Sequence, residues 1–214
     1  MPACPIPARL TGLFHLVADA ERVIADPIVR NRGTIGGSLC QGDPAEDLAT
    51  VCDVLRASAV IRGPGGERIL SMNEFHRGPY ETAVAPNELL CEIRFPIRAH
   101  SGSAYEKVER RVGDWAIVAA GAAVSLAADG TIADAAVGLT AVGVEGTIAS
   151  VQAALVGQHP SEALFAEAGR LAAEAADPVA DQRGPIDYKL HLADELTRRV
   201  VRRACERALE AQEG

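Results

Sequence analysis

The sequence predicts an α+β protein of two units that meet near residue 100. Two patterns favour this class. Short runs in which apolar and polar residues alternate are separated by glycine-containing turns, which is typical of antiparallel strands. In the second half these runs come first and longer runs with helical spacing follow, so we expect a three-stranded antiparallel sheet packed against a small helical bundle. The predicted units are residues 1–98 and 103–214.

The first unit is predicted to begin with a helix and to continue with strands. Leu13–Ala25 carries apolar residues at helical spacing and stops before Asp26-Pro27, as helices commonly do. A second short helix is expected at Leu48–Leu55. The turn sequence Gly63-Pro64-Gly65-Gly66 predicts a β-hairpin between its flanking runs. The expected strands of this unit are residues 57–62, 67–70 and 89–95.

The second unit is predicted to place three strands before three helices. Residues 97–103 break all periodicity and mark the boundary. Asp129-Gly130 lies between two alternating runs, which is a strong hairpin signal. The last helix carries five arginines that we expect to complement its dipole: Arg198, Arg199, Arg202, Arg203 and Arg207. The expected strands are residues 104–110, 116–127 and 131–142, and the expected helices are residues 148–156, 162–176 and 187–210.

Composition excludes several classes of function. The net charge of -8 and the pI near 5.2 argue against nucleic acid or an anionic membrane surface as the main partner. The cysteines are scattered, which indicates reduced thiols in a cytoplasmic protein and no disulfide, zinc or iron–sulfur site. The histidines are isolated as well, so we expect no metal site. No apolar stretch approaches the roughly 20 residues that span a bilayer, and residues 1–9 lack the pattern of a signal peptide.

The most unusual segment is the glycine-rich run between Val29 and Asp47. In Asn31–Ser38 a Gly-Gly pair lies between two hydroxyl residues, so we expect a loop whose backbone N–H groups converge on a phosphate. The run is neither a Rossmann fingerprint nor a Walker A loop, and a purely structural Gly-Gly turn stays open. Asp47 is a candidate acceptor for a ribose hydroxyl. Asp43 is a candidate cap for a helix that starts near Ala45.

Ile28–Ser38, followed by Asp43–Leu48, closely resembles the second FAD-binding motif of the medium subunits of molybdenum hydroxylases, the family of xanthine dehydrogenase and carbon monoxide dehydrogenase. Further segments resemble the same subunits in the same order, so the resemblance extends over nearly the whole chain. These segments are Arg62–Arg68, Phe75 with Gly78–Thr82, Pro86–Ile93, Tyr105–Lys107 and Arg110–Asp114.

The resemblance implies the remainder of a PCMH-type FAD-binding domain followed by a CO-dehydrogenase-flavoprotein C-terminal domain. It implies FAD as the cofactor and a flavoprotein subunit that relays electrons. The implied partners are a molybdopterin-binding large subunit and a [2Fe–2S] small subunit, from which electrons pass through FAD to an external acceptor. No catalytic acid, base or nucleophile is implied in this chain.

The implied cofactor contacts lie in four segments of the chain. The family's adenosine-side aspartate falls on Asp47, and a backbone contact near the flavin falls on Leu90 or a close neighbour. A basic flavin contact has its nearest counterpart in Lys107, although strict alignment with the xanthine dehydrogenase branch places Glu106 there. The family's pyrophosphate loop falls on Thr34, Ile35, Gly36, Gly37 and Ser38.

Two departures from the family pattern bear on cofactor binding. Cys40-Gln41-Gly42 stands where relatives often have Ala-His-Ala before Asp-Pro. The family's first FAD subdomain, with its own Ala-Gly-Gly phosphate loop, is expected to be missing from this chain. We therefore expect the isolated chain to be essentially free of FAD and to expose an apolar patch that includes part of the Leu13–Ile24 helix. A truncated, FAD-free assembly module that only binds the partner subunits is the alternative interpretation.

Overall fold

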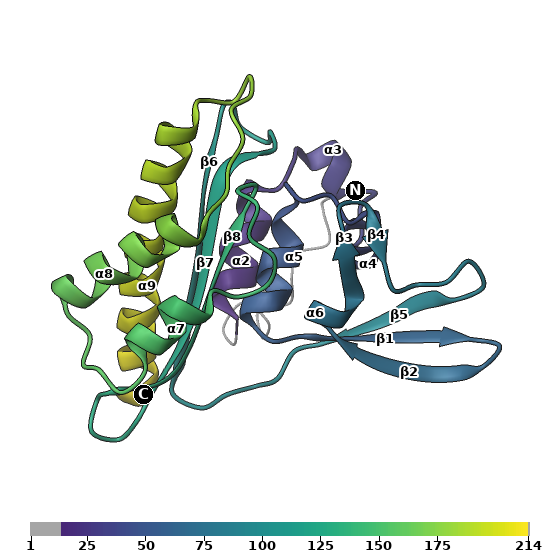
Figure 1. Cartoon of the computed structure of the whole chain (residues 1–214). Coiled ribbons are helices and arrows are strands. Elements are labelled where there is room, and N and C mark those ends of the chain that lie inside the picture. Colours follow the sequence, from purple (N-terminus) through teal and green to yellow (C-terminus); the bar gives the residue numbers. More distant parts are fainter. Residues whose placement is uncertain (1–13, 214) are drawn as a thin grey trace.

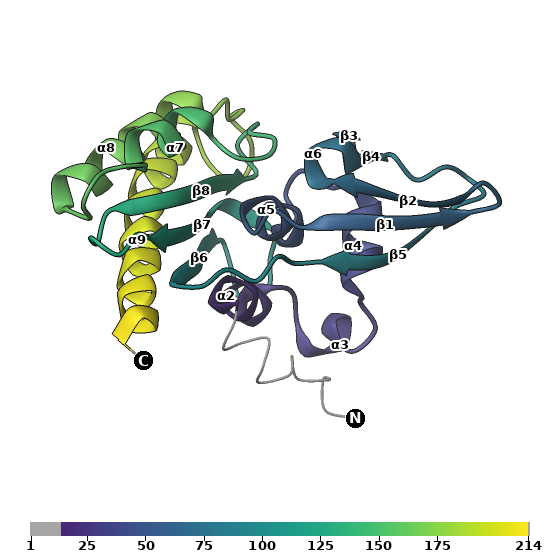
Figure 2. The same ribbon diagram turned by 90° about the horizontal axis from the view of Figure 1, so that it is seen from below.

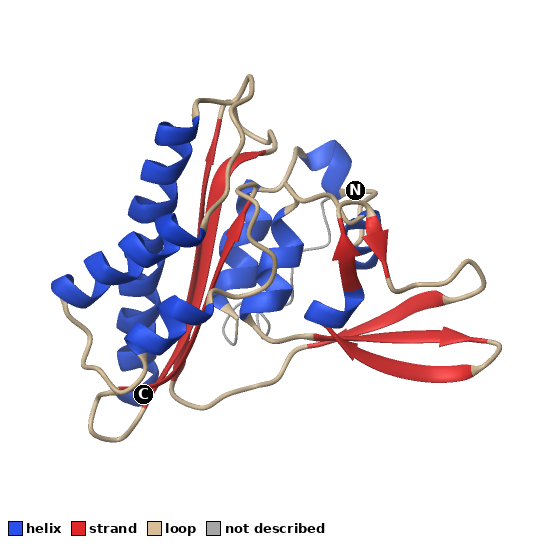
Figure 3. Cartoon of the chain, viewed as in Figure 1, coloured by secondary structure: helices blue, strands red, loops and turns tan. Residues whose placement is uncertain are grey.

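The computed structural model describes residues 14–213 and contains two three-stranded sheets and one two-stranded sheet (Figure 1, Figure 3). The predicted start of the first helix at Leu13, and the first part of the predicted unit 1–98, lie outside the described residues. The α+β class expected from the sequence is confirmed. No helix between residues 14 and 213 is both long enough and apolar enough to cross a membrane.

The larger sheet is antiparallel in the order β6-β7-β8, as the alternating runs predict. Asp129-Gly130 forms the turn of the β7–β8 hairpin, where Gly130 has a φ of 81°, a conformation that glycine adopts without steric cost. The predicted linker 97–103 is partly wrong, because β6 already begins at Ser101. The strands are β6 (Ser101–Glu109), β7 (Ala116–Leu126) and β8 (Ile132–Thr140).

Gly102 shows why the start of this strand does not look like one in the sequence. A Cβ on Gly102 would lie 2.1 Å from the carbonyl oxygen of Ala204 and 2.4 Å from the backbone nitrogen of Ala208. The strand therefore contacts the backbone of α9 (Ile186–Glu213) at a distance that only glycine permits. A residue that resembles a linker in the sequence is thus a packing contact in the fold.

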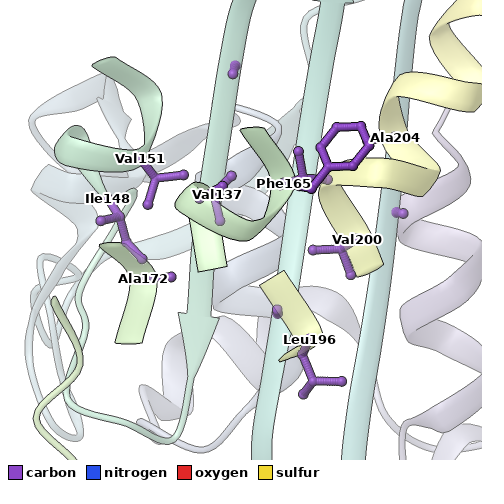
Figure 4. Packing of buried hydrophobic residues seen from close by; sticks show 14 of the residues in the cluster. Val137, Ile148, Val151, Phe165, Ala172, Leu196, Val200 and Ala204 are labelled. Carbon is purple, nitrogen blue, oxygen red and sulfur yellow. The ribbon is translucent and has the colours of Figure 1, made fainter. Parts of the chain in front are cut away.

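One face of this sheet is covered by the three C-terminal helices, α7 (Ala149–Leu155), α8 (Glu162–Ala175) and α9 (Figure 1). The core between them is aliphatic, with a single large aromatic side chain in Phe165 (Figure 4). Val137 of β8, Val151 of α7 and Val200 of α9 meet in this core. The helical bundle predicted for the second unit is therefore confirmed.

The arginines of α9 do not serve the helix dipole, because α9 extends beyond them to Glu213 and has no basic residue in its last turn. Each of them is paired with a carboxylate instead. Arg207, for example, lies 2.6 Å from Asp19 of the first helix. The dipole interpretation of these residues is wrong: Arg198 pairs within α9, and the other four pair with carboxylates on other elements.

The other face of the sheet is covered by α2 (His15–Val23) and α5 (Asp47–Val54), so helices flank the sheet on both sides (Figure 1, Figure 2). Leu16 and Ala20 of α2 are fully buried against this sheet. The predicted exposed patch on this helix is therefore wrong. Large exposed apolar side chains lie instead beside the glycine-rich segment and at the start of β5: Ile28, Val29, Ile35 and Leu89.

The smaller three-stranded sheet has the order β2-β1-β5, and the predicted 63–66 hairpin joins β1 to β2. Its core includes Leu39, Ile61 and Phe75, all fully buried. A capped turn, α6 (Met72–Phe75), leads into the two-stranded sheet. The strands are β1 (Ser58–Gly63), β2 (Gly66–Ser71), β3 (His76–Gly78), β4 (Glu81–Thr82) and β5 (Leu89–Arg94).

The glycine-rich segment that was expected to be a loop is largely helical. It contains α3 (Pro27–Arg30) and α4 (Ile35–Gln41), which are short helices separated by a turn. Asp26 accepts a hydrogen bond from the Val29 backbone and so caps α3, whose first residue is proline. The glycine pair therefore lies in the first turn of a helix and not in an irregular loop.

Candidate functional site

The candidate site begins where α4 begins. Thr34 has extended backbone angles, and its hydroxyl accepts a hydrogen bond from the backbone N–H of Gly37 at 3.0 Å. This is the arrangement of a helix N-cap. The helix ends at Gly42, which adopts the left-handed conformation with a φ of 63°. Thr34, Ile35 and Gly37 are all exposed, so the first turn of α4 faces open surface.

The two glycines of this turn have different surroundings. A Cβ on Gly36 would lie 3.8 Å from Cδ2 of Leu90, an ordinary contact distance. A Cβ on Gly37 would lie 3.1 Å from Oγ1 of Thr34 and would press on the helix cap. Leu90 of β5 is thus a direct neighbour of Gly36. The structure brings together these predicted residues from two distant segments of the chain.

Ser38 faces inwards and joins α4 to the turn before α5. Its hydroxyl donates a hydrogen bond to Oε2 of Glu46, a carboxyl that is 4% exposed. The second oxygen of Glu46, Oε1, is buried and has no hydrogen-bond partner among residues 14–213. Burial raises the pKa of Glu46 to about 7, and the negative charges of Asp47 and Asp43 act in the same direction.

Asp47 is held inside the protein by two partners on β6. The Tyr105 hydroxyl donates to Oδ1 at 2.6 Å, and Nζ of Lys107 lies 3.0 Å from Oδ2. Burial raises the pKa of Asp47, and the charge of Lys107 opposes that effect. Thr140 of β8 contacts the Tyr105 hydroxyl at 3.2 Å and extends the network. Both oxygens of Asp47 are therefore engaged by protein groups, which leaves its predicted ribose contact without support from the geometry.

Lys107 and Glu106 point to opposite faces of β6, because consecutive side chains on a strand alternate. The ammonium group of Lys107 contacts Asp47 and, at 3.3 Å, Glu109, and its side chain is only 1% exposed. Glu106 faces α9 and pairs with Arg199 at 3.1 Å. The side chain of Glu106, the residue that the alternative alignment selects, thus points away from α4, whereas that of Lys107 lies on the side of α5.

Asp43 does not cap α5, whose N-cap residue is Glu46. One carboxylate oxygen of Asp43 accepts the backbone N–H of Ala45 at 2.9 Å, which forms a local turn. The other oxygen accepts the hydroxyl of Tyr80 at 3.0 Å. The predicted cap near Ala45 is therefore wrong, because the chain makes a separate turn before the helix starts at Asp47.

Sequence reasoning missed the roles of Glu46 and Tyr105. Glu46 is one member of the acidic run Asp43–Asp47, and nothing in the sequence distinguishes the buried acids Glu46 and Asp47 from the half-buried Asp43. Tyr105 lies two residues before Lys107, so a strand prediction places both side chains on one face. That spacing is the one available signal that they share a partner.

Family models and known proteins match nearly the whole chain. Residues 6–98 match the model of the FAD binding domain in molybdopterin dehydrogenase, and residues 103–204 match that of the CO dehydrogenase flavoprotein C-terminal domain. The carbon monoxide dehydrogenase medium chain of Afipia carboxidovorans is 36% identical over 201 residues, covering 93% of this chain and 69% of that relative. The medium chain from Hydrogenophaga pseudoflava is 38% identical over 210 residues, covering 90% and 67%.

A solved structure shows the same likeness in three dimensions. The carbon monoxide dehydrogenase of Hydrogenophaga pseudoflava that lacks the Mo-pyranopterin moiety of the molybdenum cofactor matches with a TM-score of 0.88 and 34% identity. The match covers 94% of this chain and 70% of that one. The chain therefore belongs to the family of FAD-binding medium subunits of the molybdenum hydroxylases.

Proposed function

We propose that this chain is the electron-transferring flavoprotein subunit of a molybdopterin-dependent hydroxylase or dehydrogenase. The observation that carries the proposal is the exposed, glycine-containing first turn of α4 in a chain whose two halves both match this family. When bound, FAD supplies the redox chemistry, and the protein supplies position and electrostatics. In this role the chain needs no catalytic acid, base or nucleophile of its own.

The first turn of α4 fits a diphosphate. The leading N–H groups of a helix have no partner within the helix, and here they belong to the exposed Ile35 and the half-buried Gly36. No side chain on Gly36 or Gly37 covers them. We propose that these N–H groups, together with the hydroxyls of Thr34 and Ser38, hold the pyrophosphate of FAD.

The other predicted residues divide into two groups by burial. Leu90 is partly exposed beside Gly36, so it is placed to contact the cofactor directly. Asp47 and Lys107 neutralise each other inside the protein, next to the Glu46 that bonds Ser38. We propose that this ion pair stabilises the positions of α4 and α5 from the buried side of the site. A direct contact between FAD and either residue stays a prediction from the resemblance.

The proposed partners are a molybdopterin-binding large subunit and a [2Fe–2S] small subunit. The relatives are named as medium chains of carbon monoxide dehydrogenase, and one solved relative is described by its molybdenum cofactor. In this proposal electrons arrive from the [2Fe–2S] subunit and leave to an external acceptor. We also propose unit boundaries of 1–98 and 103–214, which the two matched ranges support.

Purification from the native host tests the proposal. We expect a yellow complex with a flavin absorption spectrum in which both partner subunits accompany this chain. A folded but colourless complex that contains both partners would instead support the FAD-free assembly module. Repeated isolation of the chain as a lone monomer with its own turnover would contradict the proposed partners.

A further inference from the structure

The contact between Ser38 and Glu46 links the proposed diphosphate-binding turn to a buried carboxyl group. Ser38 is in α4, and Glu46 is the residue directly before α5. The hydroxyl of Ser38 and Oε2 of Glu46 are hydrogen-bonded. The second oxygen, Oε1, is buried without a partner among the described residues. The hydroxyl of Ser38 and the backbone N–H of Ala49 lower the pKa of Glu46, but burial outweighs both.

The surroundings of Glu46 disfavour its charged form. A buried carboxylate with an unmet oxygen is unstable relative to the neutral acid. The nearest charged neighbours, Asp43 and Asp47, are acids themselves, and the ammonium of Lys107 is already engaged by Asp47 and Glu109. Two further titratable groups face Glu46, namely the Cys52 thiol and the Tyr105 phenol, and its charge raises the pKa of each. Burial, helped by the negative charges of Asp47 and Asp43, raises the pKa of the Glu46 carboxyl to about 7.

The protonation state of Glu46 decides what Ser38 is able to donate. A serine hydroxyl has one hydrogen. When Glu46 is ionised, it can only accept, so the Ser38 hydrogen is directed at the carboxylate. When Glu46 is protonated, its own O–H donates to Oγ of Ser38, and the Ser38 hydrogen is free to donate to another acceptor. A phosphate oxygen is such an acceptor.

We propose that Glu46 is a positioning residue for cofactor binding, which takes up a proton when a diphosphate binds and thereby turns the Ser38 hydroxyl towards that diphosphate. The inference rests on the proposed FAD-binding function. A second physical effect acts in the same direction, because negative charge brought to the first turn of α4 disfavours a neighbouring carboxylate. Binding of FAD and protonation of Glu46 therefore strengthen each other, as linkage requires.

Titration calorimetry tests this coupling. The protein is used as isolated, with any subunits that accompany it, after bound flavin has been removed. FAD is titrated between pH 6 and pH 8.5 in two buffers that differ in ionisation enthalpy, so that proton uptake is counted directly. We expect net proton uptake and an affinity that falls roughly tenfold for each pH unit above 7. Glu46→Gln should abolish the proton uptake and flatten the pH dependence.

Asp53→Asn is the matched control. Asp53 is a partly buried carboxyl on α5 whose pKa burial raises to about 7, but it lines a separate cleft with Arg56, Ser71 and Asn73. This variant should keep the wild-type pH slope. FAD binding that is independent of pH, or proton uptake that persists in Glu46→Gln, would overturn the inference and leave the proposed function intact. Absence of FAD binding at every pH would overturn both.

Discussion

The Nζ atom of Lys107 lies 3.0 Å from Oδ2 of Asp47, and this contact joins β6, an edge strand of the larger sheet, to α5, the helix that follows the glycine-rich segment. The side chains are 1% and 7% exposed, so water does not screen the interaction. The Tyr105 hydroxyl binds the other oxygen of the same carboxylate. A single aspartate thus connects α5 to two positions on β6.

Removal of Lys107 should destabilise the protein strongly. Lys107→Met leaves the buried carboxylate of Asp47 without its cation, and breaking a buried ion pair in this way costs about 3–5 kcal/mol. Urea denaturation monitored by circular dichroism measures the loss. Arg170→Met is the control, because Arg170 pairs with Glu167 and Glu174 on the exposed surface of α8 and should matter little. Equal effects of the two substitutions would contradict the buried-pair interpretation.

Glu46 should make the stability of the protein depend on pH. Its pKa rises from 4.5 to about 7 on folding, so the folded state binds the proton more tightly than the unfolded state does. Stability from this group is present below pH 4.5 and is lost as the pH rises through 7. The side chain that Glu46→Gln introduces cannot ionise, so the free energy of unfolding of this variant should exceed that of the wild type by up to about 3 kcal/mol at pH 8. Denaturation at pH 5, 6.5 and 8 measures the gain, and a difference that does not change with pH would refute it.

The two glycines of α4 should respond differently to alanine. Gly36→Ala has room beside Leu90 and favours a helix, so folding stability should be kept or rise by about 0.5–1 kcal/mol. If the Gly36 N–H contacts the pyrophosphate, FAD binding should nevertheless weaken by about 1–3 kcal/mol. Gly37→Ala should lower both quantities, since its Cβ meets the Thr34 hydroxyl that caps the helix.

Thermal denaturation and FAD titration of the two variants separate these effects. Thr34→Ala provides a further comparison, because it removes the cap without adding a Cβ to the turn. If Gly36→Ala binds FAD as tightly as the wild type, the first turn of α4 is not the diphosphate site, and the glycine pair serves only the fold.

Gly102→Ala should be severely destabilising. The added Cβ would lie 2.1 Å from the backbone oxygen of Ala204, and because the atoms that it meets belong to the backbone, no change of side-chain rotamer relieves the clash. We expect a loss of about 3 kcal/mol or an insoluble protein. Gly65→Ala is the matched control, since a Cβ there meets nothing within 4 Å. Similar melting temperatures of the two variants would show that β6 and α9 do not approach this closely.

The sequence by itself determined the order and type of most elements. Asp129-Gly130 and the 63–66 turn identified the β7–β8 and β1–β2 hairpins, because their backbone conformations are local properties of a few residues. The helices of the C-terminal bundle followed from periodicity, which is also local. The cofactor segment around Gly36 was identified by its resemblance to a family, and the matches to that family agree with it.

Only the tertiary structure decided what each polar or small residue does. Gly102 resembles a linker residue in the sequence, but in the fold it packs against α9, and Arg202 and Arg207 of α9 pair with carboxylates on other elements. Burial distinguishes Glu46 from the neighbouring Asp43, and only the fold shows that Asp47 forms an ion pair with Lys107. Burial and ion pairing depend on residues far apart in the sequence: Lys107 is 60 positions from Asp47, and Arg207 is 188 positions from Asp19, so no local pattern in the sequence reveals them.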